Sequence, residues 1–443
     1  MATIITTTQN EKMKKGVVEF TTPNHNLNTI TVRSDKQFHS HYGFGGAFTE
    51  STSQCFHTLS EEKKREFINA YFSESGLRYN IGRIPIHSCD FSHEIHTYVD
   101  EDDYTLASFD MSWEDEGRIP LIKECDKVAG GLVFFSAPWS PPAYMKENGD
   151  ICHGGKLKDQ CRELWAEYYA KALSGLKDRG INVSFASVQN EPEAIQTWES
   201  REVDGTEEGL EIRDYLVPAF KKYGLDSVKF LIWDHNRDRM VPRAIETLSI
   251  EGVTEHVWGL GYHWYCCNKF ENISAFRQLF PDKHVLLSEC CVETAHDSTT
   301  GLASQAGIWE HGERYGKQII NDLLNGSEGY IDWNLMLDEN GGPNHVGNFC
   351  EAPIMLDGKG GIVYNPSYWY IGHFSRFIRS GAKMVLCSAG KDGIYAVAYQ
   401  NPDGQKVVVV MNENDRDEMC HFDIDGNHIN FNVEKHSIST ILV

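Results

Sequence analysis

Two glutamates are the residues best suited to chemistry in this chain. Glu191 stands in the string "SVQNEPEA" (187–194), directly after an apolar run, and Glu289 lies in the run "HVLLSECC" (284–291). One carboxyl group on each side of a sugar supplies a general acid and a nucleophile, the minimum needed to cleave a glycosidic bond with retention. "NEP" by itself is a common turn string, because Asn and Pro favour turns. The hypothesis therefore depends on both glutamates reaching one place.

Electrostatics would separate the roles of the two carboxyl groups. If they lie ~5 Å apart, their repulsion at an effective dielectric of ~20 is about 3 kcal/mol, which raises one pKa by roughly two units. One carboxyl group then stays protonated near neutral pH. We assign the acid to Glu191 and the ionised nucleophile to Glu289, with Arg83 and Tyr265 as the groups that hold and orient Glu289.

Eight apolar runs between about residues 40 and 380 are predicted to be strands, since they are short and rich in β-branched and aromatic residues. They cover 42–50, 78–87, 131–139, 182–190, 228–236, 257–265, 284–291 and 329–337. Amphipathic stretches with helix signals lie between them, such as 60–76, which opens with the capping residue Ser60. Continuous apolar strands that alternate with helices indicate a covered parallel sheet, and eight such units close into a (β/α)₈ TIM barrel.

The active site of such a barrel lies at the carboxyl ends of its strands. The residues at or just beyond the predicted strand ends are Arg83, Asp90, Trp139, Asn190, Glu191, Asp234, His263, Tyr265, Glu289 and Trp333. Trp139 and Trp333 offer apolar faces on which a pyranose can stack, and Asn190 and Asp90 can hydrogen-bond its hydroxyl groups. His263 is interpreted as a hydrogen-bonded core histidine.

Both chain ends have a different pattern, with strand-like runs and no intervening helices. We predict a β-sandwich built from the two termini and packed on the barrel. The predicted division is 1–38 for the N-terminal strands of the sandwich, 39–381 for the catalytic barrel and 382–443 for the C-terminal part of the sandwich. An isolated hairpin from residues 16 to 34 would be only marginally stable.

The charge and composition of the chain disfavour several classes of binding partner. The formal charge of −23 disfavours nucleic acid and anionic membrane surfaces, because both are polyanions. The first residues have no signal-peptide core, and no apolar stretch approaches the ~18 residues of a membrane span, so we expect a cytoplasmic protein without integral membrane association. The twelve cysteines are expected to be buried reduced thiols. Their spacing disfavours a zinc site, and the proposed chemistry needs neither metal nor cofactor.

Seven ordered blocks resemble glycoside hydrolase family 30, most closely its glucosylceramidase branch. They are "FGGAFTES" (44–51), "YNIGRIPIHSCDFS" (79–92), "APWSPPAYMKENG" (137–149), "VQNEP" (188–192), "GYHWY" (261–265), "LLSECCV" (286–292) and "DWNLMLDENGGPNHVGNF" (332–349). The resemblance implies a barrel with a sandwich from both termini, with Glu191 as acid/base and Glu289 as nucleophile of a retaining mechanism. It places the sugar-binding positions at Asp90, Trp139, Asn190, Trp333 and Asn348, with Arg83, His263 and Tyr265 as supporting residues.

The loop at 193–205 departs from the lysosomal member of that branch. This loop is expected to shape the leaving-group side, with Trp198 as an aromatic wall. The expected activity is that of a retaining, exo-acting β-glycosidase, with a β-glucosidase favoured, and the expected partner is a β-glycoside small molecule or oligosaccharide. Homo-oligomerisation is left open.

Four alternatives remain from the sequence. Two lie within the family, a β-xylosidase and a β-1,6-glucanase. A carbohydrate-binding barrel without activity is disfavoured because both carboxylates are present. A phosphate-binding barrel enzyme is disfavoured because "GGPN" (341–344) has no Lys or Arg beside it.

Overall fold

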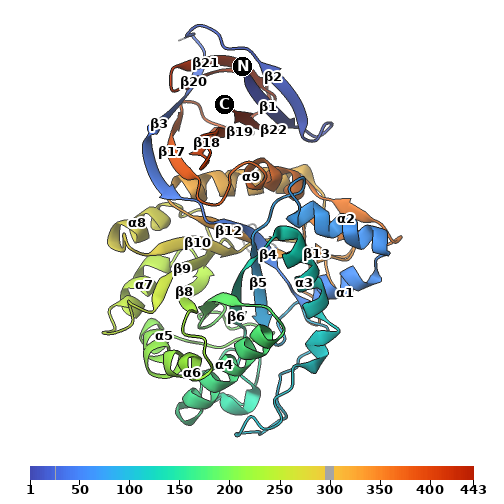
Figure 1. The fold of residues 1–443 in the computed structure, drawn as a ribbon, viewed down its shortest axis with the longest axis vertical. Helices are drawn as coiled ribbons and strands as arrows, with labels where there is room; N and C mark the ends of the chain where they lie inside the picture. Colours follow the sequence, from blue (N-terminus) through green and yellow to red (C-terminus); the bar gives the residue numbers. More distant parts are fainter. Residues whose placement is uncertain (25, 295–303) are drawn as a thin grey trace.

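A closed barrel of parallel strands forms the larger part of the computed structural model, which describes residues 1–24, 26–294 and 304–443 (Figure 1). All eight predicted strands are present and are paired in the order in which they follow along the chain, with the last joined to the first. They are β4 (Gly43–Ala47), β5 (Ile81–Ile86), β6 (Val133–Pro138), β7 (Val183–Ser187), β8 (Lys229–Asn236), β9 (Val257–His263), β10 (His284–Glu289) and β12 (Gly329–Asn334). The predicted TIM barrel is confirmed.

Helices surround the barrel and follow its strands. They are α1 (Glu50–Thr58), α2 (Glu61–Phe72), α3 (Arg118–Ala129), α4 (Arg162–Asp178), α5 (Gly205–Glu211), α6 (Val217–Lys222), α7 (Met240–Leu248), α8 (Glu271–Leu279), α9 (Trp309–Leu324) and α10 (Pro366–Ser375), with 3₁₀ turns at Ser112–Asp115, Ala143–Met145 and Asp159–Cys161. The predicted cap at Ser60 is present, since its side chain accepts a hydrogen bond from the backbone N–H of Lys63. Helix α4, for example, buries an apolar face that includes Trp165, Tyr169 and Leu173.

The sequence pattern predicts one helix over 208–224, but the structure has a π-helical turn at Ile212–Leu216 between α5 and α6. The turn lies just before Pro218, which has no backbone N–H to donate and whose ring crowds the preceding turn. A π-bulge widens the helix at that point and relieves the crowding.

The second part of the molecule is a β-sandwich that contains both termini (Figure 1). Its strands are β1 (Ala2–Thr7), β2 (Lys14–Val18), β3 (Asn28–Ser40), β17 (Lys383–Ala389), β18 (Ile394–Gln400), β19 (Lys406–Asn412), β20 (Glu418–Ile424), β21 (Asn427–Val433) and β22 (Ser437–Leu442). They form one nine-stranded sheet in the order β2-β1-β22-β19-β18-β17-β3-β20-β21. A backbone bridge from Thr21 to His428 brings the two edges of the sheet together, so its apolar residues face each other across one core.

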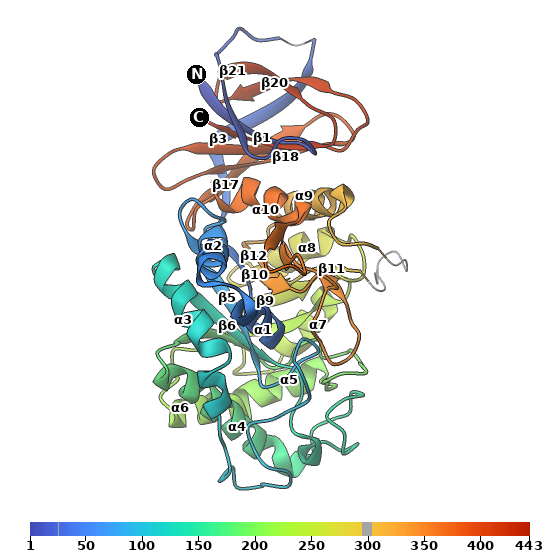
Figure 2. The ribbon, with the colours of Figure 1, turned by 90° about the vertical axis from the view of Figure 1, so that its right-hand side faces the viewer.

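Helices α9 and α10 lie between the barrel and the sandwich (Figure 2). On α10 the buried imidazole of His373 is hydrogen-bonded to the hydroxyl groups of Thr7 and Thr440, one near each chain terminus. On α9 the ammonium group of Lys317 pairs with Glu413 of the sandwich. These contacts fix the sandwich against one side of the barrel.

Short strands follow β10 and β12 along the chain and form two small sheets outside the barrel. Strand β11 (Val292–Glu293) pairs with β14 (Cys350–Glu351), and β13 (Met336–Leu337), β15 (Ile354–Leu356) and β16 (Ile362–Tyr364) form a small sheet. The first pairing places the segment after Glu289 beside the segment after Asn348. Among the described residues, no helix combines the length and the apolar character that crossing a membrane requires.

Candidate active site

A pocket enclosing about 160 Å³ opens at the carboxyl ends of the barrel strands. Its lining comes from loops or strand ends all around the barrel and comprises Asp90, Trp139, Asn190, Glu191, Gln196, Trp198, His235, Asn236, Tyr265, Glu289, Cys291, Glu293, Trp333, Asn348 and Cys350. All of the site residues predicted from the sequence line it except Arg83 and His263. Those two are fully buried and contact the lining carboxylates from beneath.

Glu289, at the end of β10, is held by two donors. Arg83 Nη1, from β5, donates a short hydrogen bond to Glu289 Oε2, and the Tyr265 hydroxyl donates to Oε1 at 3.0 Å. Arg83 Nη2 also donates to Asn190 Oδ1 at 2.8 Å and to Asp234 Oδ2 at 3.0 Å. One guanidinium thus orients side chains from three strands, which is possible because its donors are arranged in a planar fork.

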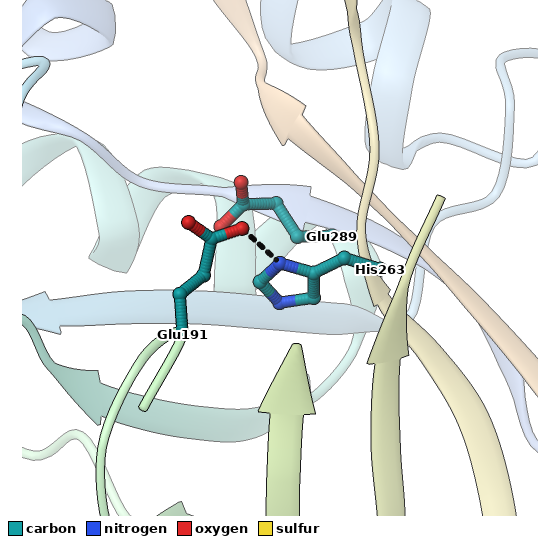
Figure 3. A group of neighbouring side chains, drawn as sticks. All are labelled: Glu191, His263 and Glu289. Atoms are coloured by element: carbon teal, nitrogen blue, oxygen red, sulfur yellow. Dashed lines mark hydrogen bonds and ion pairs between the residues drawn. The ribbon is translucent and has the colours of Figure 1, made fainter. Parts of the chain in front are cut away.

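Glu191, just beyond β7, reaches toward Glu289 and is held by His263 of β9 (Figure 3). His263 Nδ1 lies 3.0 Å from Glu191 Oε1, and its Nε2 lies 3.1 Å from Asp234 Oδ1. Asp234 also accepts from Ser288 at 2.6 Å. A Cβ at Gly261 would lie 2.7 Å from the Ser288 hydroxyl, so only glycine leaves room for this bond. His263 is the buried, hydrogen-bonded histidine that the sequence predicted, and one of its two partners is a carboxylate that lines the pocket.

The backbone is strained where these side chains leave their strands. Glu191 has a φ of 47°, Trp233 of 73° and Asp234 of 52°, in the left-handed region that side chains other than glycine rarely adopt. The pairing of β8 with β9 also shifts register between Trp233 and His235. Such strain costs about 1–3 kcal/mol per residue and is concentrated at functional sites. Here it turns Glu191, Asp234 and His235 toward the pocket.

The proton distribution differs from our expectation. One oxygen of Glu191, one of Glu289 and a ring nitrogen of His263 all lie within 4.8 Å of one another. Although burial opposes it, the charge of His235 and the hydrogen bond from His263 lower the pKa of Glu191 to about 2. Burial raises the pKa of Glu289 in spite of the charges of His263 and Arg83. The two pKa values are separated, as predicted. The raised pKa belongs to Glu289, however, whereas we expected it at Glu191.

His263 explains this reversal. Burial disfavours its charged form, but the charge of Glu289 and the hydrogen bonds to Asp234 and Glu191 raise its pKa to about 9. An imidazolium at neutral pH therefore faces Glu191. Because the three groups are in contact, they titrate as one unit that exchanges protons internally. That two histidines, His235 and His263, face Glu191 was not predicted from the sequence.

The remaining predicted residues lie on the other walls. Trp139 stacks on Trp333, with ring centroids 5.3 Å apart and planes at 21°, and both rings are 2% exposed. Each ring therefore presents only a small area to the pocket, rather than the open face we expected. Asn348 donates to Asp90 Oδ2 at 3.1 Å. Burial, and then the charge of Glu289, raise the pKa of Asp90 well above its usual range.

Several residues at the pocket had no role predicted from their sequence. Asp234 was noted only as a strand end, and Gln196, His235 and Asn236 were not singled out, although "WDHN" (233–236) ends a predicted strand and offered that signal. Trp198 lines the pocket as predicted, together with Gln196 from the same loop.

Glu191, His263 and Glu289 also have the composition of a metal site. Their surroundings do not fit one. Both ring nitrogens of His263 are hydrogen-bonded to carboxylates, and Arg83 already places a cation on Glu289. A divalent ion there would face two positive charges.

Comparisons with known proteins identify the family of both parts of the chain. The glycosyl hydrolase family 30 TIM-barrel domain matches residues 41–378, and the beta sandwich domain of that family matches 381–441. The chain is 33% identical over 407 residues to the lysosomal acid glucosylceramidase of Mus musculus, covering 88% of this chain and 78% of that protein. It is 24% identical over 424 residues to an endo-1,6-beta-D-glucanase of Trichoderma harzianum, covering 90% of this chain and 83% of that one.

Among solved structures, SrfJ from Salmonella typhimurium superposes with a TM-score of 0.94 and 34% sequence identity, over 100% of this chain and 99% of that one. An endo-beta1,6-glucanase at 24% identity shares the fold, with a TM-score of 0.87 over 100% of this chain and 98% of that one. With the family's domains matched along nearly the whole chain, this protein belongs to glycosyl hydrolase family 30 and is a glycosidase.

Proposed function

We propose that the chain is a retaining, exo-acting β-glycosidase that removes a terminal β-linked glucosyl unit. The observation that carries the proposal is the approach of Glu191 and Glu289, whose nearest oxygens lie within 4.8 Å at the ends of two barrel strands. Retaining glycosidases place their carboxyl groups about 5–5.5 Å apart, whereas inverting enzymes need about 6.5–9.5 Å to admit a water molecule. The separation supports double displacement.

In the first step Glu289 attacks the anomeric carbon while Glu191 protonates the departing oxygen. The bonds from Arg83 and Tyr265 leave Glu289 lone pairs for the attack and fix its direction. The proton comes from the shared unit of Glu191, His263 and Glu289. Glu289 attacks as a carboxylate, since both of its oxygens accept hydrogen bonds, and Glu191, in contact with His263, holds the proton that the leaving oxygen takes.

In the second step Glu191 acts as a base and water releases the sugar. Glu191 is ionised once the leaving group has taken its proton, and it can then accept the proton of the attacking water. Glu289 then departs as a carboxylate, stabilised by the same two donors. Asn190, held by Arg83, is placed to donate to the sugar 2-hydroxyl group, a contact that strengthens in the transition state.

The pocket shape supports exo action on one sugar unit. Its 160 Å³ is smaller than the roughly 300–1,000 Å³ typical of sites for drug-sized ligands. Asp90 and Asn348 are the proposed partners of the sugar hydroxyl groups, and Trp198 is the proposed wall for the leaving group. The similarity to a glucosylceramidase favours glucose as the terminal sugar.

An endo-acting β-1,6-glucanase is the second candidate, because the chain also resembles endo-1,6-glucanases along most of its length. Assays of the sugars released from aryl β-glucosides and from β-1,6-linked glucan distinguish the two candidate functions. We expect release of glucose alone from both substrates, and internal cleavage to longer oligosaccharides would favour the second candidate. Proton NMR of the first product tests the mechanism: retention gives the β-anomer first, and the α-anomer first would refute it.

A further inference from the structure

An ion pair without an assigned role joins two loops at the pocket mouth. His345 Nε2 lies 3.3 Å from Glu199 Oε2. The Glu199 side chain is fully buried, and neither of its carboxylate oxygens has a hydrogen-bond partner within the described parts of the chain. A buried carboxylate needs a compensating charge. His345 supplies it, and although burial opposes this, Glu199 in turn raises the pKa of His345.

His345 belongs to a rigid turn that carries Asn348. The Asn344 side-chain oxygen accepts hydrogen bonds from the backbone N–H groups of Val346, Gly347 and Asn348 at 3.1, 2.7 and 3.2 Å. The Asn344 amide nitrogen donates to the Asn348 carbonyl at 2.9 Å. A turn tied together in this way moves as a unit, so a displacement of His345 displaces Asn348.

Two further contacts attach this turn to the loop after β5. His345 Nδ1 lies 3.1 Å from the carbonyl oxygen of Ser92, to which an imidazolium donates. Asn348 donates to Asp90 Oδ2 at 3.1 Å. His345 is therefore placed between the Asp90 loop and Glu199.

Glu199 lies in a loop that is itself anchored. Its backbone pairs with that of Cys152. The next carbonyl group, of Ser200, accepts a hydrogen bond from Lys146 Nζ at 2.7 Å. The preceding residue is Trp198, which lines the pocket. Glu199 thus offers a fixed point for His345.

We propose that the His345–Glu199 pair is a latch that holds the Asn348 turn against the Trp198 loop and so positions Asp90 and Asn348 for the sugar. Both members are positioning residues, since neither lines the pocket. The kinetic consequence rests on the proposed glycosidase function. Contacts to sugar hydroxyl groups act on the bound substrate and the transition state alike, so their loss raises KM and leaves kcat nearly unchanged.

The test uses the full chain with Glu199→Gln and the double variant Glu199→Gln/His345→Ala. The single variant keeps the size of the side chain and loses its charge. The double variant leaves no uncompensated buried charge, and so keeps the fold without the latch. With an aryl β-glucoside we expect the double variant to raise KM about ten-fold with kcat within about three-fold of wild type, and the single variant to fall between.

His284→Gln is the matched control, because His284 pairs with the buried Glu328 at 2.6 Å at the start of β10, the opposite end from the pocket. Hydrogen exchange of segments 193–205 and 338–349 gives a readout independent of activity. We expect faster exchange in both segments of the double variant and wild-type exchange in the control. Unchanged KM and exchange in the double variant, or equal changes in the control, would overturn the latch. A wild type that cleaves no glycoside would refute the proposed function, and exchange would still decide on the latch.

Discussion

Replacing Tyr265 by Phe removes one of the two donors that hold Glu289. The Tyr265 hydroxyl donates to Glu289 Oε1 at 3.0 Å, while Arg83 serves the other oxygen. Phe keeps the ring and its packing. The change removes the hydrogen bond to the proposed nucleophile, together with the contact of the same hydroxyl group to Cys291 Sγ at 3.4 Å.

The expected loss of rate follows from the negative charge on Glu289, the acceptor of this hydrogen bond. A hydrogen bond to a charged group contributes about 1.5–3 kcal/mol, which corresponds to roughly a 10- to 150-fold change in rate. In the second step Glu289 leaves the sugar as a carboxylate, and the Tyr265 hydroxyl group stabilises the developing charge. We therefore expect breakdown of the glycosyl-enzyme to slow by this factor.

Stopped-flow kinetics with an activated aryl β-glucoside measures this directly. We expect Tyr265→Phe to show a burst of aryl alcohol followed by a steady state about 10- to 150-fold slower than wild type. Tyr79→Phe is the matched control, since its buried hydroxyl group has no hydrogen-bond partner in the described structure. A steady-state rate within about three-fold of wild type would refute the assigned role of this bond.

Four other outcomes are expected. Glu191→Ala should lower kcat/KM on alkyl β-glucosides by about 10²–10⁴-fold and far less on dinitrophenyl β-glucoside, whose leaving group needs no proton, and equal losses would contradict the acid role. Burial raises the pKa of Asp332 to about 7, so the folded protein binds the extra proton and loses stability as pH rises from about 4 to 7. In urea titrations at pH 5 and 8, Asp332→Asn should remove about 3 kcal/mol of this loss, from the roughly two pH units between 5 and the raised pKa at about 1.36 kcal/mol each, and an unchanged pH dependence would contradict it. Trp198→Ala should raise KM several-fold for aryl β-glucosides and leave glucosyl fluoride, which has no aromatic aglycone, unaffected; equal effects would remove Trp198 from the leaving-group side. Dialysis against EDTA should leave kcat/KM unchanged, because His263 and Arg83 already compensate the carboxylates, whereas loss restored by a divalent metal would contradict this.

The barrel was predictable because its strands are buried on both faces and therefore read as continuous apolar runs. The strand β1 was not predicted. It lies between β2 and β22, so its partners include the last strand of the chain, and local sequence carries no sign of that pairing. The π-helical turn before Pro218 likewise depends on how a continuing helix accommodates the proline.

Site residues were predictable where the end of a strand in the sequence is enough to place the residue at the pocket. Glu191 and Glu289 reach one pocket because parallel strands end at the same rim of the barrel. The role of His235 was not predictable, because it depends on left-handed backbone at Trp233 and Asp234 and on a register shift, neither of which alters the apolar pattern. The same geometry sets the charge around Glu191 and hence its lowered pKa.

Trapping with a 2-deoxy-2-fluoroglucosyl fluoride, followed by mass spectrometry of the digested protein, tests the central claim most directly. The fluorine at position 2 slows both the formation and the breakdown of the glycosyl-enzyme. Fluoride is a good leaving group and restores the rate of formation, so the adduct accumulates. We predict one fluoroglucosyl group per chain, linked to Glu289, and none in Glu289→Gln. An adduct on Glu191 or on any other residue, or turnover by Glu289→Gln at the wild-type rate, would contradict the account.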